Sequence, residues 1–224
     1  MSIHYVSHGR GKPVVFFHGW GFDHQIWLSL VPFLANSYQL ILVDLPGFGL
    51  TPSMGWEAFK EELIAQLPAE FAVVGWSMGG LLASRLALEE PLRANALLNI
   101  ASSPQFIGDK NWPGVARNIF NEFYNNLASD LAQTLQEFVR LQLNKTKLTV
   151  PLGRLPSLEG LQQGLGLLES WDLRKDISKL SQPTAYMFGR LDPLASPKTM
   201  KTMQVIYPEF KYILFNKAAH IPFL

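Results

Sequence analysis

The stretch "VVGWSMGGLLASRLA", residues 73–87, decides the fold of this chain. A short apolar run ends at Gly75, Ser77 follows on a glycine-rich turn, and a helical pattern begins directly afterwards. Residues 75–79 fit the pattern G-x-S-x-G, in which a sharp turn between a strand and a helix exposes a serine. The turn indicates either close packing of a strand on a helix or a nucleophilic Ser77. Only the second interpretation predicts partners elsewhere in the chain.

Apolar runs on both sides of this turn predict a mostly parallel sheet. Continuous apolar runs that end in turn residues are typical of strands buried on both faces. The predicted strands are 13–21, 39–49, 72–77, 96–103, 183–192 and 211–220, and the helical stretches between them are 24–35, 57–67, 78–89 and 196–206. This alternation predicts an α/β fold with right-handed crossovers and helices on both faces of the sheet.

The middle of the chain, residues 104–170, is expected to be helical. Its apolar side chains recur at three- and four-residue spacings, and it contains no convincing buried strand. An insertion that follows the carboxyl end of a strand is well placed to cover a site there. We therefore predict a core formed by residues 1–103 and 171–224 and a helical cap formed by residues 104–170. The alternative is that this segment is only another packed layer.

A nucleophilic serine needs a base and an acid that orients the base, which in α/β hydrolases follow it at the ends of later strands. His220 follows the last predicted strand, and the other four histidines, at positions 4, 8, 18 and 24, all precede Ser77. Asp192 follows the preceding strand, whereas Asp172 and Asp176 lie in a segment typical of a helix cap or a charged face. The order predicts a triad of Ser77, Asp192 and His220.

Two backbone N–H groups are expected to stabilise the oxyanion. Met78 begins the helix after the turn, where unpaired N–H groups and the positive end of the helix dipole lie. Trp20 belongs to the loop "HGWG" that follows an early strand. In the same loop His18 is expected to be structural, with its ring bonded to loop backbone. Asp44 precedes the serine and is expected to anchor a loop rather than to act as the acid.

Composition excludes several classes of function. The formal net charge of +1 gives no global case for nucleic-acid binding, and the absence of cysteine excludes disulfides and thiolate zinc sites. The N-terminal segment has no apolar core typical of a signal peptide, and no apolar run is long enough to span a membrane. There is no metal-ligand spacing and no G-x-G-x-x-G pattern, so we expect neither a metal nor an organic cofactor. We expect a soluble, cytoplasmic monomer.

Seven short stretches carry a resemblance to a known family: "HGWG" (18–21), "LPGFG" (45–49), "GWSMGG" (75–80), "FVRLQ" (138–142), "WDLR" (171–174), "GRLD" (189–192) and "KAAHIPF" (217–223). The chain resembles the α/β-hydrolase superfamily along its whole length. Within it, the chain is most similar to the BioH-type carboxylesterases of biotin synthesis. The resemblance implies hydrolysis of the methyl ester of a pimeloyl chain carried by an acyl carrier protein, which yields pimeloyl-carrier protein and methanol.

The same resemblance implies roles for individual residues. Ser77, Asp192 and His220 match the triad of the family, and Trp20 and Met78 match its oxyanion loops. The cap segment that lines the acyl pocket is matched by five residues, namely Phe138, Val139, Arg140, Leu141 and Gln142. The superfamily normally continues into a closing helix after the histidine, whereas four residues follow His220. We therefore expect that helix to be absent from this chain.

A basic stretch in the cap suggests a docking surface for an acidic carrier protein. Between positions 138 and 158 there is no acidic residue, and the basic residues are Arg140, Lys145, Lys147 and Arg154. Such charges beside a substrate entrance steer an acidic partner. The alternative is an ordinary solvated helix face.

Two other functions remain open from the sequence. A general short-chain carboxylesterase or a thioesterase would use the same triad, and the sequence does not separate an ester from a thioester. A non-catalytic binding protein on the same scaffold is the second alternative. It is less favoured because such proteins usually lose a member of the triad, and all three candidates are present.

Overall fold

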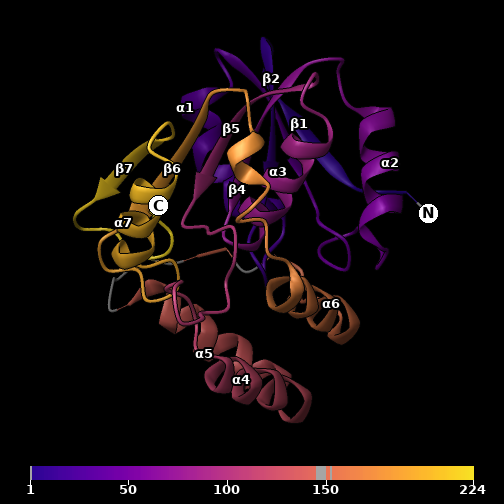
Figure 1. Cartoon of the computed structure of the whole chain (residues 1–224). Coiled ribbons are helices and arrows are strands. Elements are labelled where there is room, and N and C mark those ends of the chain that lie inside the picture. The colour runs from indigo at the N-terminus through magenta and orange to yellow at the C-terminus, as the bar shows by residue number, and fades with distance from the viewer. Residues whose placement is uncertain (1, 145–149, 152) are drawn as a thin grey trace.

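A computed structural model describes residues 2–144, 150–151 and 153–224 of the chain (Figure 1). Within these ranges seven strands form one sheet in the order β1-β3-β2-β4-β5-β6-β7. The strands are β1 (Tyr5–His8), β2 (Lys12–Phe17), β3 (Tyr38–Val43), β4 (Phe71–Trp76), β5 (Ala94–Ile100), β6 (Thr184–Gly189) and β7 (Lys211–Phe215). β1 pairs antiparallel with β3, and the other pairs are parallel. The predicted α/β class with a mostly parallel sheet is confirmed.

Helices cover both faces of the sheet because successive strand residues point to opposite sides. Phe17 belongs to a buried cluster with side chains of α2 (Trp56–Gln66) and α3 (Met78–Glu89). Phe16 belongs to a second cluster with side chains of η1 (His24–Leu30), α1 (Val31–Leu34) and α7 (Pro197–Ile206). Each fully buried large apolar side chain stabilises the fold by about 1.5–3 kcal/mol. The two clusters make the sheet a rigid platform.

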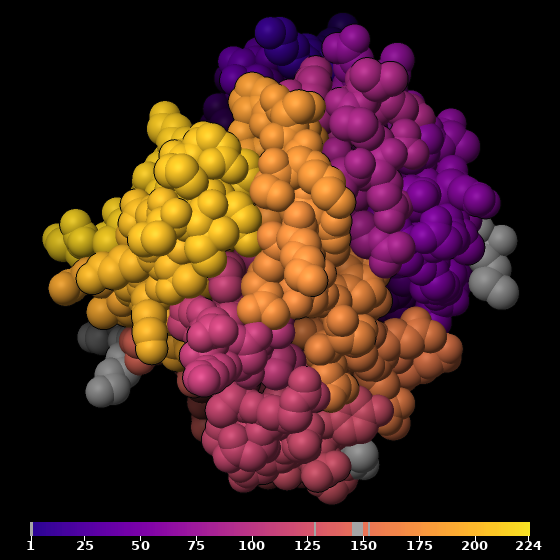
Figure 2. All heavy atoms as spheres, viewed as in Figure 1, coloured from indigo at the N-terminus to yellow at the C-terminus, as the bar shows by residue number. Residues whose placement is uncertain are grey.

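Three helices between β5 and β6 lie beyond the edge of the sheet, at the bottom of Figure 1. They are α4 (Arg117–Ser129), α5 (Leu131–Leu143) and α6 (Leu158–Ser170). The side chain of Asp130 accepts a hydrogen bond from the Gln133 N–H, which separates α4 from α5 and caps α5. In Figure 2 the segment after α6, in orange, runs between the N-terminal half in purple and the C-terminal part in yellow. This segment, which includes η2 (Ile177–Lys179), returns the chain to β6.

The structure differs from the sequence expectation in two places. β1 was not expected, because four partly exposed residues give little apolar signal. The predicted helix 24–35 is a 3₁₀-helix followed by a short α-helix. Several predicted strands also end earlier, since the glycine and polar residues at their carboxyl ends turn away from the sheet. No helix in the described ranges is long and apolar enough to cross a membrane.

Candidate active site

Ser77 lies on the sharp turn between β4 and α3. Its backbone has φ 55° and ψ −121°, a conformation that costs a non-glycine residue about 1–3 kcal/mol. A side chain at Gly75 would collide with the backbone of Gly79 and Gly80, and one at Gly79 would collide with the carbonyl of Phe17. The glycines therefore let β4, α3 and the loop after β2 approach closely enough to hold the strained turn.

Ser77, His220 and Asp192 form a hydrogen-bonded chain at the carboxyl edge of the sheet. The Nε2 atom of His220 lies 2.8 Å from Ser77 Oγ, and its Nδ1 atom lies 2.8 Å from Asp192 Oδ2. The other carboxylate oxygen accepts the backbone N–H groups of Leu194 at 2.8 Å and Ala195 at 3.1 Å. All three side chains are buried. A carboxylate at Nδ1 selects the Nδ1–H tautomer, so Nε2 accepts the proton of Ser77.

Neighbouring elements hold the two loops that carry Asp192 and His220. Trp76 Nε1–H donates to the carbonyl of His220 at 2.7 Å, and the His220 N–H donates to the carbonyl of Gln142 at 3.2 Å. Asn144, which ends α5 in a left-handed conformation, donates from Nδ2 to the carbonyl of Leu191 at 2.7 Å. The carboxyl end of α5 therefore contacts both loops directly.

The backbone N–H groups of Met78 and Trp20, the two expected oxyanion donors, are unpaired in the described part of the chain. Met78 is the first residue of α3, so its N–H has no acceptor within the helix, and the positive end of the helix dipole lies there. Trp20 lines the same cavity as Ser77. Neither backbone N–H donates to an acceptor in the part of the chain that the structure describes. Both groups are thus free to bind a negatively charged oxygen.

His18 links the loop that carries Trp20 to the loop after β3. Its Nδ1–H donates to the carbonyl of Gly19 at 2.8 Å, and its Nε2 accepts the backbone N–H of Leu45 at 2.9 Å. Burial lowers the pKa of the imidazole below its ordinary value. The ring is therefore neutral at physiological pH, and its expected bonding to loop backbone is confirmed.

A cavity of about 100 Å³ lies between Ser77 and the cap helices. Its other lining residues are apolar, namely Trp20, Phe106, Val115, Ile119, Phe120, Phe123, Phe138, Leu141, Leu165, Leu168 and Leu194. The Phe138 ring stands edge-on to Trp20, with centroids 5.0 Å apart, and lies 5.3 Å from Phe123. Such a lining suits an aliphatic chain and excludes charged groups.

The cap segment 138–142 divides between the cavity and other surroundings. Phe138 and Leu141 line the cavity, because residues three apart share one face of a helix. Val139 packs against the cluster on the other face of the sheet, and Arg140 is exposed. Gln142 is buried, and its described contact with the site is the backbone carbonyl that accepts the His220 N–H.

The four basic residues of the cap are only partly described by the structure. Arg140 and Arg154 are exposed. Lys145 and Lys147 lie outside the described residues. The structure therefore places two of the four positive charges on the surface of the cap.

Asp23 joins the cap to the loop that carries Trp20. One carboxylate oxygen accepts the N–H of Gln25 at 2.9 Å, and the other accepts the N–H of Arg154 at 2.8 Å. Asp23 is buried, and Gly153 has φ +61° and lies so close that a side chain there would collide with the carboxylate. We call this contact between Asp23 and residues 153–154 the clasp.

Comparison with known proteins agrees with this geometry. A family model described as alpha/beta hydrolase fold matches residues 12–224. The chain belongs to the α/β-hydrolase family. A "Pimeloyl-[acyl-carrier protein] methyl ester esterase" of Legionella pneumophila (strain Lens) is 58% identical over 224 residues, which cover 100% of this chain and 94% of the relative. A protein of the same name from Aeromonas hydrophila is 37% identical over 241 residues, with the same two coverages.

A solved structure shows the same fold. An esterase from Exiguobacterium antarcticum superposes on this α/β hydrolase with a TM-score of 0.89 at 22% identity, covering 97% of this chain and 88% of the other. The resemblance to BioH-type carboxylesterases that the sequence indicated is confirmed by the two relatives, and so is the prediction of a carboxylic ester hydrolase.

Two residues that shape the site of this α/β hydrolase were missed by sequence reasoning. The Asn144 side chain binds the carbonyl of Leu191, 47 residues further along the chain. The Asp23 side chain binds the N–H of Arg154, 131 residues further along. For Asn144 a signal existed, since asparagine is one of the residues that tolerate the left-handed end of a helix. For Asp23 the sequence shows only a helix cap.

Proposed function

We propose that the protein is a serine carboxylesterase that hydrolyses the methyl ester of pimeloyl-[acyl-carrier protein] to pimeloyl-[acyl-carrier protein] and methanol in biotin synthesis. The hydrogen-bonded chain from Ser77 through His220 to Asp192, opening on an apolar cavity under a cap, is the observation that carries this proposal. The names of the relatives that are 58% and 37% identical support the substrate.

The reaction proceeds through an acyl-enzyme. His220 Nε2 takes the proton of Ser77 as Oγ attacks the ester carbonyl, and Asp192 stabilises the resulting imidazolium. The N–H groups of Trp20 and Met78 bind the oxygen that becomes negative. The imidazolium then protonates the departing methoxide. A water molecule, deprotonated by the same nitrogen, releases the acid.

The apolar cavity receives the carbon chain of the substrate. Phe138 and Leu141 contribute to its wall from the cap, and Trp20 contributes from the core. No charged side chain lines the cavity among the described residues, so a substrate whose far end is a free carboxylate loses hydration there without compensation. A chain whose far carboxyl is joined to a carrier avoids this penalty.

The carrier protein is proposed to dock on the basic surface of the cap. Arg140 and Arg154 are exposed there, and Lys145 and Lys147 belong to the same stretch of sequence. Changing Arg140 and Arg154 to Glu should lower kcat/KM for the carrier-linked ester and leave a small free ester nearly unchanged, because the charges act on encounter. The double variant Lys198→Glu/Lys201→Glu, which reverses two exposed charges on α7, is the matched control. Equal losses on both substrates would contradict docking at this surface.

One comparison of substrates tests the reaction itself. Methanol and free acid are measured after incubation with methyl pimeloyl-carrier protein, with a small methyl ester and with an acyl thioester. We expect fastest turnover of the carrier-linked methyl ester, an intact thioester bond to the carrier, and no turnover by Ser77→Ala. Preferential release of the carrier by thioester cleavage would identify a thioesterase instead.

The remaining sequence predictions extend this proposal. The core is proposed to consist of residues 1–103 and 171–224, with residues 104–170 as the cap, in keeping with the position of α4, α5 and α6. That the protein is a monomer stays a prediction. Its location in the cytoplasm also stays a prediction, and the absence of cysteine fits a reducing compartment. Catalysis by the triad requires no cofactor.

A further inference from the structure

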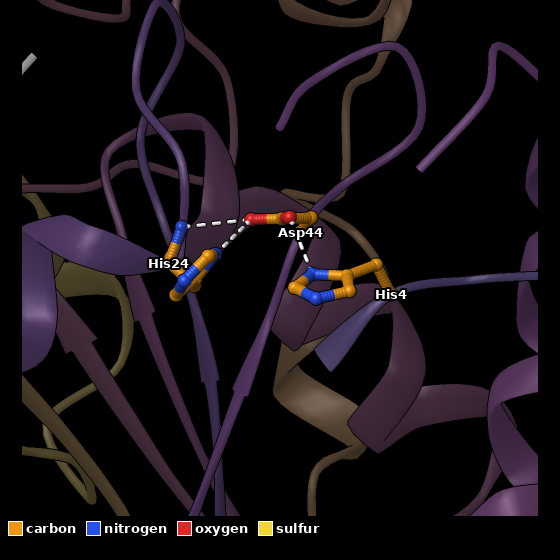
Figure 3. Close-up of side chains that lie close together, drawn as sticks. All are labelled: His4, His24 and Asp44. Carbon is orange, nitrogen blue, oxygen red and sulfur yellow. Dashed lines mark hydrogen bonds and ion pairs between the residues drawn. The ribbon is translucent and has the colours of Figure 1, made fainter. Parts of the chain in front are cut away.

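Two histidines and an aspartate from three distant segments meet outside the catalytic chain (Figure 3). His4 precedes β1, His24 begins η1, and Asp44 follows β3. The Nδ1 atom of His4 lies 2.7 Å from Asp44 Oδ2, and the Nδ1 atom of His24 lies 2.8 Å from Asp44 Oδ1. One ligand atom from each residue lies within 4.8 Å of the others.

The carboxylate of Asp44 is fixed by the backbone. The N–H of His24 donates to Oδ1 at 2.9 Å, and the N–H of Leu50 donates to Oδ2 at 3.0 Å. Each of the two carboxylate oxygens also faces one imidazole nitrogen, Oδ2 that of His4 and Oδ1 that of His24.

We propose that His4, His24 and Asp44 bind a transition-metal ion such as Zn²⁺. Two imidazole nitrogens and one carboxylate form a donor set that Zn²⁺, Ni²⁺ and Cu²⁺ accept, whereas Mg²⁺ and Ca²⁺ prefer oxygen ligands alone. The two backbone N–H groups on Asp44 orient the carboxylate as outer partners do in metal sites. A fourth position is left for water.

Metal binding requires the two rings to shift. Zinc bonds of about 2.0–2.1 Å in a tetrahedron place neighbouring ligand atoms roughly 3.3 Å apart. Each imidazole nitrogen now lies 2.7 or 2.8 Å from a different carboxylate oxygen, and the ligand atoms of the three residues lie within 4.8 Å of one another. The rings therefore move until both nitrogens and one carboxylate oxygen reach the spacing that the ion sets. The metal takes the place of the Nδ1 protons, which pass to Nε2 or to solvent.

The exposure of the two rings gives the ion an entry path. The side chains of His4 and His24 are 29% and 15% exposed, while that of Asp44 is fully buried. A bound ion would join the N-terminal segment at His4 to the start of η1 at His24, which follows the loop that carries Trp20. It would stabilise the folded chain through mass action, without contact with the atoms of the triad. No local spacing marks these ligands in the sequence, because residues 4, 24 and 44 lie far apart along the chain.

Zinc binding to the full-length chain, freed of metal with a chelator, tests the site. Isothermal titration should show one Zn²⁺ per chain, and Zn²⁺ should raise the thermal midpoint. His4→Gln and His24→Gln should each weaken binding tenfold or more, and together they should abolish it. His8→Gln, which removes a histidine of β1 outside the cluster, is the matched control and should change nothing. Circular dichroism checks that each variant is folded.

His220 is the competing zinc ligand, so His220→Gln is measured in parallel. Retained binding in that variant supports the proposal. If the double variant His4→Gln/His24→Gln bound Zn²⁺ as tightly as the unchanged chain, or if binding vanished with His220→Gln, the proposal would be wrong. A Mg²⁺ titration should show no saturable binding, and Mg²⁺ binding as tight as that of Zn²⁺ would also contradict the assigned donor set.

Discussion

The clasp can be broken from either of its two sides. Asp23→Ala removes the acceptor of the Arg154 N–H and also that of the Gln25 N–H. Gly153→Ala leaves Asp23 in place but puts a methyl group against its carboxylate, at a position with φ +61°. If both changes break the same interaction, the second should lower the free energy of unfolding by less when the first is already present.

The structure sets the size of each effect. A hydrogen bond to a charged group contributes about 1.5–3 kcal/mol to stability, and the lower end applies because the N–H of the exposed Arg154 finds water instead. Asp23→Ala also removes a helix cap, worth about 0.5–2 kcal/mol, for a total near 2–3.5 kcal/mol. Gly153→Ala adds about 1–2 kcal/mol of left-handed strain. The double variant loses the clasp once, so its cost should fall short of the sum by about 1.5 kcal/mol.

Urea unfolding of the four proteins measures this coupling, and steady-state kinetics measures its consequence for the site. We expect kcat/KM for the carrier-linked ester to fall in both single variants, because the clasp lies three residues from Trp20. Asp130→Ala is the matched control. It removes the side chain that caps the N-terminus of α5, and that hydrogen bond joins two residues of the helical cap without contacting the clasp. Its effect should add to that of Gly153→Ala. Additivity within about 0.5 kcal/mol for Asp23→Ala and Gly153→Ala would refute the reasoning.

Three further predictions concern the reacting groups and the cavity. Ser77→Ala and His220→Ala should each lower kcat on a small ester by about 10⁴-fold or more, and near-normal kcat in either folded variant would contradict the triad. Asp192→Asn should lower kcat by about 10⁴-fold, because the amide no longer selects the Nδ1–H tautomer; a change confined to KM would contradict this role. Phe138→Ala should raise KM for the carrier-linked ester about tenfold or more through lost apolar contact, with little change for a methyl acetate control.

The meeting of Ser77, Asp192 and His220 could be predicted because a parallel sheet imposes a simple rule. Its strands all end at one edge, so polar residues directly after separate strands come together there. Ser77 follows β4, Asp192 follows β6 and His220 follows β7, and the chain order matches that of the family. The alternative acids failed this rule: the carboxylate of Asp172 instead pairs with Arg174 at 2.7 Å.

Contacts between a side chain and distant backbone could not be predicted in this way. Asp23 binds the backbone N–H of Arg154, and Asn144 binds the backbone carbonyl of Leu191. Every residue except proline carries both backbone groups, so no pattern of residue types marks such contacts. β1 was missed for a related reason. As a short edge strand it buries little apolar surface. Its antiparallel pairing with β3 depends on tertiary contacts and not on local strand propensity.

The position of α5 couples substrate binding to the geometry of the triad. The same helix presents Phe138 to the acyl cavity and holds both loops at its carboxyl end, through the carbonyl of Gln142 and the side chain of Asn144. A displacement of α5 that opens the cavity must therefore also remove a hydrogen bond from the His220 N–H and one from the Leu191 carbonyl. A chain seated in the cavity opposes that displacement. Under the proposed function, substrate binding is therefore expected to stabilise the arrangement of Asp192 and His220.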